Sequence, residues 1–171
     1  MASIFGHAIV GYTLSKTIRT NSLKWLTFAA VCSAVLPDID VVGFKMGIPY
    51  SHPLGHRGFT HSIIFSVLWA LLLMVLFARQ RKLIWFLVVF LATISHGVLD
   101  AITSGGMGIG FFIPFDDSRY FFPLRPILVS PIGIERFFSE WGLKVLLSEL
   151  KYIAIPCLLV SVVTNFLKTY K

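Results

Sequence analysis

The chain has 171 residues, of which 56% are hydrophobic and 13% are charged, and its mean hydropathy is +0.82. A soluble domain of this length needs more polar residues to cover its surface, so the composition excludes an ordinary soluble enzyme and predicts a membrane protein. The net charge is +7, but Lys and Arg cluster at the ends of apolar segments. We therefore expect membrane lipids, and no nucleic acid, as partners.

The apolar segments predict an all-α fold, in which a single domain of residues 1–171 forms an integral membrane bundle of about four to five segments. The expected helices cover residues 2–18, 23–36, 60–78, 83–103 and 152–167. The first is only weakly hydrophobic, so we expect it to pack inside the bundle or to enter the membrane in part. The third and fourth each approach the ~20 residues that a span requires.

Proline is expected to end one of these helices and to bend another, and a long loop precedes the last helix. The helix at 23–36 is expected to end near Pro37, and the last helix to be kinked at Pro156 after an amphipathic start near Gly142. Residues 104–142 are rich in glycine and aromatic residues. They predict a long outer-face loop region that lies at the level of the lipid headgroups.

Basic residues mark alternate connections. Segments 16–24, 79–82 and 167–171 contain Lys and Arg but no acidic residue; the residues are Lys16, Arg19, Lys24, Arg79, Arg81, Lys82, Lys168 and Lys171. Short basic loops stay in the cytoplasm. These connections are therefore expected to face the cytoplasm, and the remaining connections to face outward.

The chemistry-bearing residues fall at the predicted outer ends of the spans. They are His7, Asp38 and Asp40 in L-P-D-I-D, His56, Arg57 and His61 in H-R-G-F-T-H-S, and His96 and Asp100 in H-G-V-L-D. Since two helices end outside and two begin there, the topology predicts that these residues meet at one depth. His96 and Asp100 share a helix face at spacing i, i+4. His61 is expected in the first turn of its helix, with Thr60 as the N-cap.

Histidine and carboxylate ligands at one depth predict a metal site, with Zn²⁺ the preferred ion, Mn²⁺ or Fe²⁺ alternatives, and one or two ions bound. The predicted ligands are His7, Asp40, His56, His61, His96 and Asp100. Either Asp38 or Asp40 could be a metal ligand, and the other could be the general base. His7 could be a ligand or a residue that orients one. Arg57 is expected to contact a substrate phosphate. Without a metal, the same residues would be interfacial hydrogen-bonding groups and an N-cap aspartate.

These motifs, with H-A-I-V-G near the start and S-P-I-G-I-E-R-F-F-S later, resemble the YdjM-like family of bacterial inner-membrane proteins over residues 7–139. The family is described as LexA-regulated, metal-dependent hydrolases, which implies a multi-pass inner-membrane protein linked to the SOS response. More distantly, the pattern is similar to the zinc-dependent phospholipase C and P1 nuclease group. That likeness implies His7, Asp38 or Asp40, His56 or His61, His96 and Asp100 as ligands.

The chain departs from the phospholipase C pattern because no histidine follows His96, so we expect one or two ions rather than three. The leading hypothesis is a membrane-embedded metal-dependent hydrolase. It would act on a phosphoester or lipid-linked ester at the outer, periplasmic bilayer interface. One alternative is a small cation or proton transporter that uses the same residues. Another is a non-catalytic membrane stress protein with a structural metal.

Overall fold

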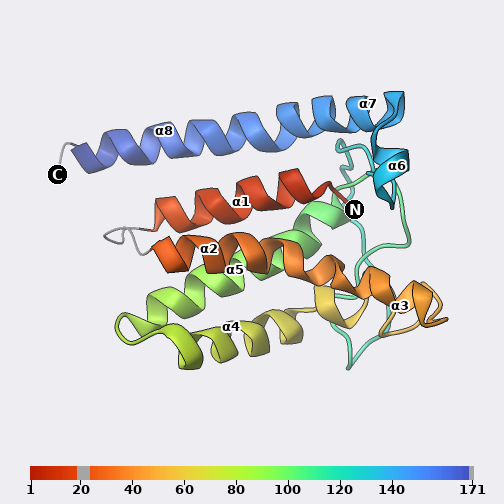
Figure 1. Cartoon of the computed structure of the whole chain (residues 1–171), viewed down its shortest axis with the longest axis horizontal. Helices are drawn as coiled ribbons and strands as arrows, with labels where there is room; N and C mark the ends of the chain where they lie inside the picture. The colour runs from red at the N-terminus through yellow and green to blue at the C-terminus, as the bar shows by residue number, and fades with distance from the viewer. Residues whose placement is uncertain (19–23, 170–171) are drawn as a thin grey trace.

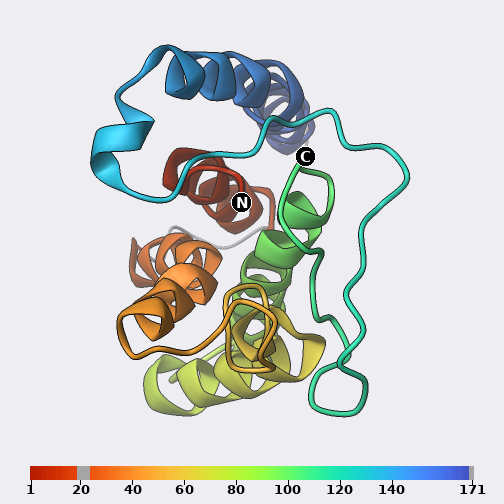
Figure 2. The same cartoon turned by 90° about the vertical axis from the view of Figure 1, so that its right-hand side faces the viewer.

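The computed structural model describes residues 1–18 and 24–169, and within these ranges it contains helices and no strand (Figure 1). The predicted all-α bundle is confirmed. Five helices run along the long axis of the bundle: α1 (Ile4–Thr17), α2 (Lys24–Val35), α4 (Ile63–Phe77), α5 (Lys82–Ala101) and α8 (Ile155–Thr169). Viewed along that axis, α1 lies between α8 and α2, and α5 lies between α1 and α4 (Figure 2).

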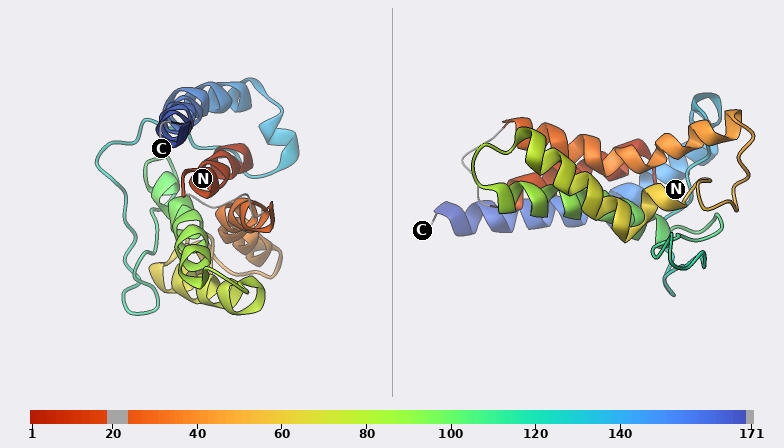
Figure 3. Two further views of the ribbon diagram at one scale, coloured as in Figure 1. Left: turned by 90° about the vertical axis from the view of Figure 1, so that its left-hand side faces the viewer. Right: turned by 90° about the horizontal axis from the view of Figure 1, so that it is seen from below.

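The two ends of the bundle differ in character (Figures 1 and 3). We call one of them the loop end. There α1 and α4 begin, α2 and α5 end, and the long connections 46–58 and 102–133 are found. At the other end lie the turn between α4 and α5 and the last turn of α8. The basic residues expected in the cytoplasm belong to this second end, except that Arg19 and Lys171 lie outside the described residues.

The second helical segment is longer than the sequence suggested. A 3-10 helix, η1 (Leu36–Val41), continues α2 without a break, and α3 (Val42–Lys45) follows it. The α-helix α2 ends at Val35, as expected near Pro37. The chain nevertheless stays helical, because Pro37 lies in the first turn of η1, where no intrahelical hydrogen bond needs its missing N–H group. This extension carries the two aspartates of L-P-D-I-D beyond the end of α2.

The helix after the H-R-G-F-T-H-S motif begins later than predicted. Ser62 is extended and caps α4, because its hydroxyl accepts a hydrogen bond from Phe65 N at 3.1 Å. Thr60 is therefore not the N-cap, and His61 ends a short 3-10 helix, η2 (Phe59–His61), instead of lying in the first turn of α4. The helix keeps 15 residues.

Three helical stretches of the described chain are long and apolar enough to cross a membrane: Lys24–Lys45, Lys82–Ala101 and Glu140–Thr169. Ile63–Phe77 is a shorter apolar helix and falls below the ~20 residues of a full span. Of the about four expected spans, the described residues thus contain three by length, and the segment expected at 60–78 forms a shorter apolar helix.

The C-terminal third is helical sooner than expected. The long loop reaches residue 133, after which come α6 (Ile134–Phe137) and α7 (Glu140–Glu149), so residues 134–142 are not the predicted loop. A π-helical turn, η3 (Leu150–Ala154), joins α7 to α8 just before Pro156, as expected where proline interrupts the hydrogen-bond ladder. The described residues of α8 include none that is buried, which suits a helix that faces lipid.

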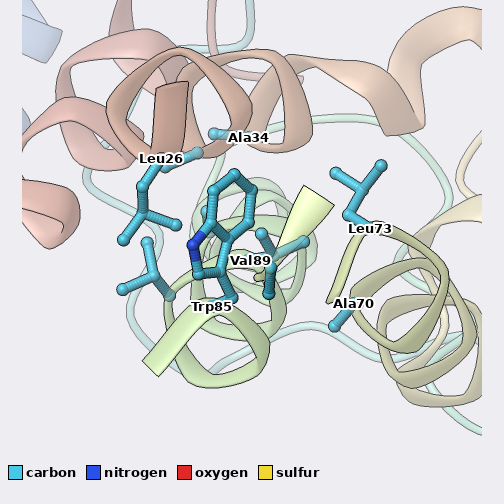
Figure 4. Close-up of a cluster of buried hydrophobic side chains, with 10 residues drawn as sticks. Leu26, Ala34, Ala70, Leu73, Trp85 and Val89 are labelled. Atoms are coloured by element: carbon cyan, nitrogen blue, oxygen red, sulfur yellow. The ribbon is translucent and has the colours of Figure 1, made fainter. Parts of the chain in front are cut away.

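The apolar core lies between α2, α4 and α5. Figure 4 shows the Trp85 indole packed beside Leu26 and Val89. Small residues bring α1 even closer to α2, since a Cβ at Gly11 would lie 2.7 Å from the carbonyl oxygen of Ala30. Close approach through small residues is the usual means of packing helices in a membrane.

We expect Gly11→Ala to lower the free energy of unfolding by about 1–3 kcal/mol, because the added methyl group forces α1 and α2 apart. Thermal unfolding in detergent measures the change. Gly43→Ala is the matched control, since a Cβ there meets its nearest atom at 3.5 Å. Equal melting temperatures for the two variants would contradict the close packing of α1 on α2.

Candidate metal centre

The predicted site residues come together at the loop end from four parts of the chain. α1 contributes one, η1 contributes two, the loop before α4 contributes three, and the last turns of α5 contribute two. They are His7, Asp38, Asp40, His56, Arg57, His61, His96 and Asp100. All are buried except Asp38, whose side chain is 9% exposed. The convergence that the topology predicted is therefore present.

Four of these residues form a compact group that could hold a metal ion: Asp38, His61, His96 and Asp100. One potential ligand atom from each lies within 4.8 Å of all the others. Asp38 Oδ1 is 3.3 Å from His96 Nε2 and 3.8 Å from His61 Nε2. Asp100 Oδ2 is 4.0 Å from His61 Nε2. A second group, formed by Asp40, His56 and His61, shares His61.

In both histidines of the first group, His61 and His96, Nδ1 contacts an oxygen atom of the protein. His96 Nδ1 donates to the carbonyl oxygen of Ala34 at 2.8 Å. His61 Nδ1 lies 3.2 Å from Asp40 Oδ2 and 3.1 Å from Thr60 Oγ1. A proton on Nδ1 leaves the Nε2 lone pair free, as a metal-binding histidine requires. Burial lowers the pKa of His61 to about 4, so its imidazole is neutral at pH 7.

The atoms that point into the first group make no hydrogen bond to the described part of the protein, although Asp100 Oδ2 lies close to two positively charged groups, Arg57 Nε at 3.2 Å and the Met1 amino group at 3.8 Å. His61 Nε2, His96 Nε2, Asp100 Oδ2 and both oxygens of Asp38 are buried and have no hydrogen-bond partner in residues 1–18 and 24–169. Buried polar atoms are nearly always paired, because leaving one unpaired costs free energy. An ion bound to these atoms would satisfy all four residues, so the donor set fits a metal.

Asp40 organises the loop around this group. Its Oδ1 accepts from His56 Nδ1 at 2.7 Å, and its Oδ2 accepts from Arg57 N at 3.0 Å and Thr60 Oγ1 at 2.8 Å, in addition to the His61 contact. A carboxylate with this many donors is anchored in one orientation. It fixes the loop and both of its histidines relative to η1.

Arg57 is fully buried and its donors are already directed at protein atoms. Its Nε lies 3.2 Å from Asp100 Oδ2, its Nη1 donates to Gly105 O at 2.8 Å, and its Nη2 donates to Thr103 Oγ1 at 3.1 Å. A Cβ at Gly106 would lie 2.3 Å from Nη1, so glycine leaves the room that the guanidinium needs. Arg57 thus ties the loop after α5 to Asp100.

His7 lies against the group without joining it. Its ring stacks on His96 at a centroid distance of 3.6 Å and an interplanar angle of 9°. Its Nε2 is 3.4 Å from Asp100 Oδ1, and the same oxygen accepts from Ala2 N at 2.6 Å. The amino group of Met1 is 3.8 Å from Asp100 Oδ2. The geometry suits a residue that orients His96 and Asp100.

The contacts that three residues make around the site were not predicted from the sequence. Thr60 binds Asp40 instead of capping a helix. Glu149, in α7, accepts hydrogen bonds from the backbone N and the hydroxyl of Ser3, and thereby links the C-terminal helices to the start of α1. Arg119 donates to the carbonyl oxygens of His56 and His52, each at 3.0 Å. Of these three residues, only Glu149 could have been noticed in the sequence, because an acidic residue within an apolar helix often marks a functional position.

The charges of the cluster favour a cation. Its side chains comprise three carboxylates, from Asp38, Asp40 and Asp100, and one guanidinium, from Arg57, and the Met1 amino group adds a positive charge 3.8 Å from Asp100 Oδ2. Uncompensated negative charge is costly where water is excluded. A metal cation would compensate the remaining negative charge, so the arrangement can bind a metal and hold it at the end of an apolar bundle.

Comparison with known proteins agrees with a membrane setting. The model of a family described as YdjM inner membrane protein matches residues 1–170. The chain is also 37% identical over 163 residues to the inner membrane protein YbcI of Escherichia coli strain K12, which covers 93% of this chain and 94% of that protein. No solved structure matches the chain significantly.

We expect His96→Ala to lose the bound divalent metal, because it removes one of four converging ligand atoms. Elemental analysis of detergent-purified protein, prepared without chelators, measures the content. His52→Ala is the control, since His52 is exposed and its Nδ1 accepts only from Leu54 N, at 3.1 Å, among the hydrogen bonds found. Metal retained in full by His96→Ala would show that the ligand set is wrong.

We expect Asp40→Asn to weaken metal binding by about 10–100-fold, the usual effect of removing a carboxylate that orients a ligand histidine. Competition with a chelator of known affinity measures the change. Asp116→Asn, in the loop that carries Ser118 and Tyr120, should leave the affinity unchanged. If both variants bind metal like the wild type, Asp40 does not orient His61.

Proposed function

The chain belongs to the YdjM inner membrane protein family, and from its buried His and Asp cluster we propose that it is a membrane-embedded, metal-dependent hydrolase. The substrate class that we propose is a phosphoester or a related lipid-linked ester. The single observation that carries the proposal is the set of four converging, buried ligand atoms on Asp38, His61, His96 and Asp100.

We assign these four residues as the metal ligands. Two imidazole nitrogens and two carboxylate oxygens suit Zn²⁺, and Mn²⁺ or Fe²⁺ are the alternatives. When bound, such an ion polarises an ester or phosphoryl oxygen and lowers the pKa of water. Asp38 is the least buried of the four and is the one that also lines the neighbouring pocket. It is therefore the residue best placed to accept a proton from an attacking water.

The remaining residues position the ligands. Asp40 holds the His61 and His56 rings, Arg57 holds Asp100, and His7 supports His96 by stacking. The sequence suggested Asp40 and His56 as further ligands and Arg57 as the contact to a phosphate. Those roles stay predictions. The full set of donors around Asp40 and the burial of Arg57 favour positioning instead.

We place the site on the periplasmic face of the inner membrane. The metal group lies at the loop end, whereas Lys16, Lys82 and Lys168 belong to the opposite end. Basic ends of spans stay in the cytoplasm. The distant likeness to the phospholipase C and P1 nuclease group, through His96 and Asp100 in H-x-x-x-D, supports phosphoester chemistry. The LexA link of the family supports a role in the stress response.

A transporter that uses the same residues is less well supported. The core between α2, α4 and α5, on the far side of the metal group, is built from apolar residues such as Leu26, Val88 and Trp85. A transport path needs polar groups through the full depth of the membrane.

The test is hydrolysis of a panel of phosphoesters, including phospholipids, by protein in nanodiscs. We expect activity that a chelator removes and Zn²⁺ or Mn²⁺ restores, and that Asp38→Ala reduces by at least about 10²-fold because proton transfer and a ligand are both lost. Asp117→Ala, at an exposed loop position, is the control. Metal-loaded protein that hydrolyses nothing, but conducts ions in liposomes in a manner that depends on Asp100, would overturn the hydrolase assignment.

A further inference from the structure

A pocket of about 890 Å³ opens beside the metal group at the loop end. Its walls come from the first turn of α1, the last turns of α2, η1, and the segment 130–138. The residues that define it are Phe5, Val31, Val35, Ile39, Ile132 and Phe137. Its volume lies within the range of about 300–1,000 Å³ that is usual for small-molecule sites.

The pocket is continuous with the metal group through one residue. Asp38 lines the pocket, and its Oδ1 is 3.3 Å from His96 Nε2. Both of its carboxylate oxygens are buried and have no hydrogen-bond partner within the described ranges. A molecule in the pocket would therefore have one end at Asp38 and the rest along apolar walls.

The walls offer almost no hydrogen-bonding capacity. Apart from Asp38, the polar side chains with oxygen among the lining residues are Ser3 and Ser130, and the Ser3 hydroxyl already donates to Glu149 at 2.5 Å. No Lys, Arg or His is among the lining residues. A peptide segment in this pocket would leave its backbone groups unpaired, at a cost of several kcal/mol for each one, whereas a hydrocarbon chain has no such groups.

The pocket also opens toward the side of the bundle. Phe5 and Ile39 remain 59% and 60% exposed, and Phe138, on the opposite wall, is 81% exposed. The Phe5 and Phe137 rings both line the pocket and are in contact with each other, with centroids 6.1 Å apart. In a membrane such a rim meets lipid chains, so a chain can enter from the bilayer without crossing water.

We propose that this pocket binds one hydrocarbon chain of the substrate and so selects amphiphiles whose hydrolysable group lies at Asp38. The inference rests on the proposed hydrolase function and narrows its substrate class to lipids. Val35 and Ile132 both line the pocket, one from α2 and the other from the loop before α6. A large side chain at Val35 should therefore exclude the hydrocarbon chain.

The test is photolabelling in nanodiscs that contain phosphatidylethanolamine with a diazirine on one acyl chain. Labelled peptides are mapped by mass spectrometry in the wild type and in the Val35→Trp variant. Val163→Trp is the matched control, because Val163 lies on α8 and is 55% exposed but does not line the pocket. We expect labelling of residues 31–41 and 130–138 in the wild type, loss of it in Val35→Trp, and retention of it in Val163→Trp.

Two further readouts separate this inference from the proposed function. Metal content should be the same in all three proteins, and hydrolysis of a long-chain phosphoester should fall more than that of a short-chain one in Val35→Trp. Equal labelling in Val35→Trp and Val163→Trp, or crosslinks to a second copy of the chain at these residues, would overturn the pocket assignment. Specific labelling without bound metal or hydrolysis would support the pocket and overturn the hydrolase.

Discussion

The structure depends on a carboxylate buried at the end of an apolar helix. Asp100 is fully buried in the last turn of α5, a place where an uncompensated charge is costly. Its partners come from distant parts of the chain: Arg57 from the loop before α4, His7 from α1, and Ala2 from the segment before α1. Satisfying this one carboxylate brings together the start of α1, the end of α5 and the loop between them. The same elements position His96 and also His61, whose Nε2 lies 4.0 Å from Asp100 Oδ2.

The sequence predicted the convergence of the site because membrane topology is a strong constraint. Spans that alternate in direction place His7, His61 and Asp100 at one end, and the i, i+4 spacing places His96 beside Asp100 on one helix face. Local rules were ambiguous where the prediction failed. Pro37 can follow the end of a helix or occupy its first turn, and both Thr60 and Ser62 are good N-caps. The tertiary bond from Thr60 to Asp40 decides between the two caps, and a single sequence holds no signal for it.

The different roles of Asp38 and Asp40 could not be predicted from the sequence either. Asp38 and Asp40 are two residues apart, and either could have been a ligand. Within the 3-10 helix η1, Asp38 faces His96 and the apolar pocket, whereas Asp40 faces the loop and accepts its N–H and O–H donors. The Asp38 carboxylate is therefore available to bind an ion, whereas the Asp40 carboxylate holds the loop around the metal group in place. It also connects the metal group to the bilayer, because the pocket beside Asp38 is lined by apolar residues of α1 and α2.

The central claim is that Asp38, His61, His96 and Asp100 hold one divalent ion. X-ray absorption at the zinc edge of detergent-purified, zinc-loaded protein tests it most directly, because that spectrum counts the ligands by type. The account predicts a first shell of nitrogen and oxygen at about 2.0–2.2 Å that includes two imidazoles. A shell that contains sulfur, or one with no imidazole contribution, would contradict it.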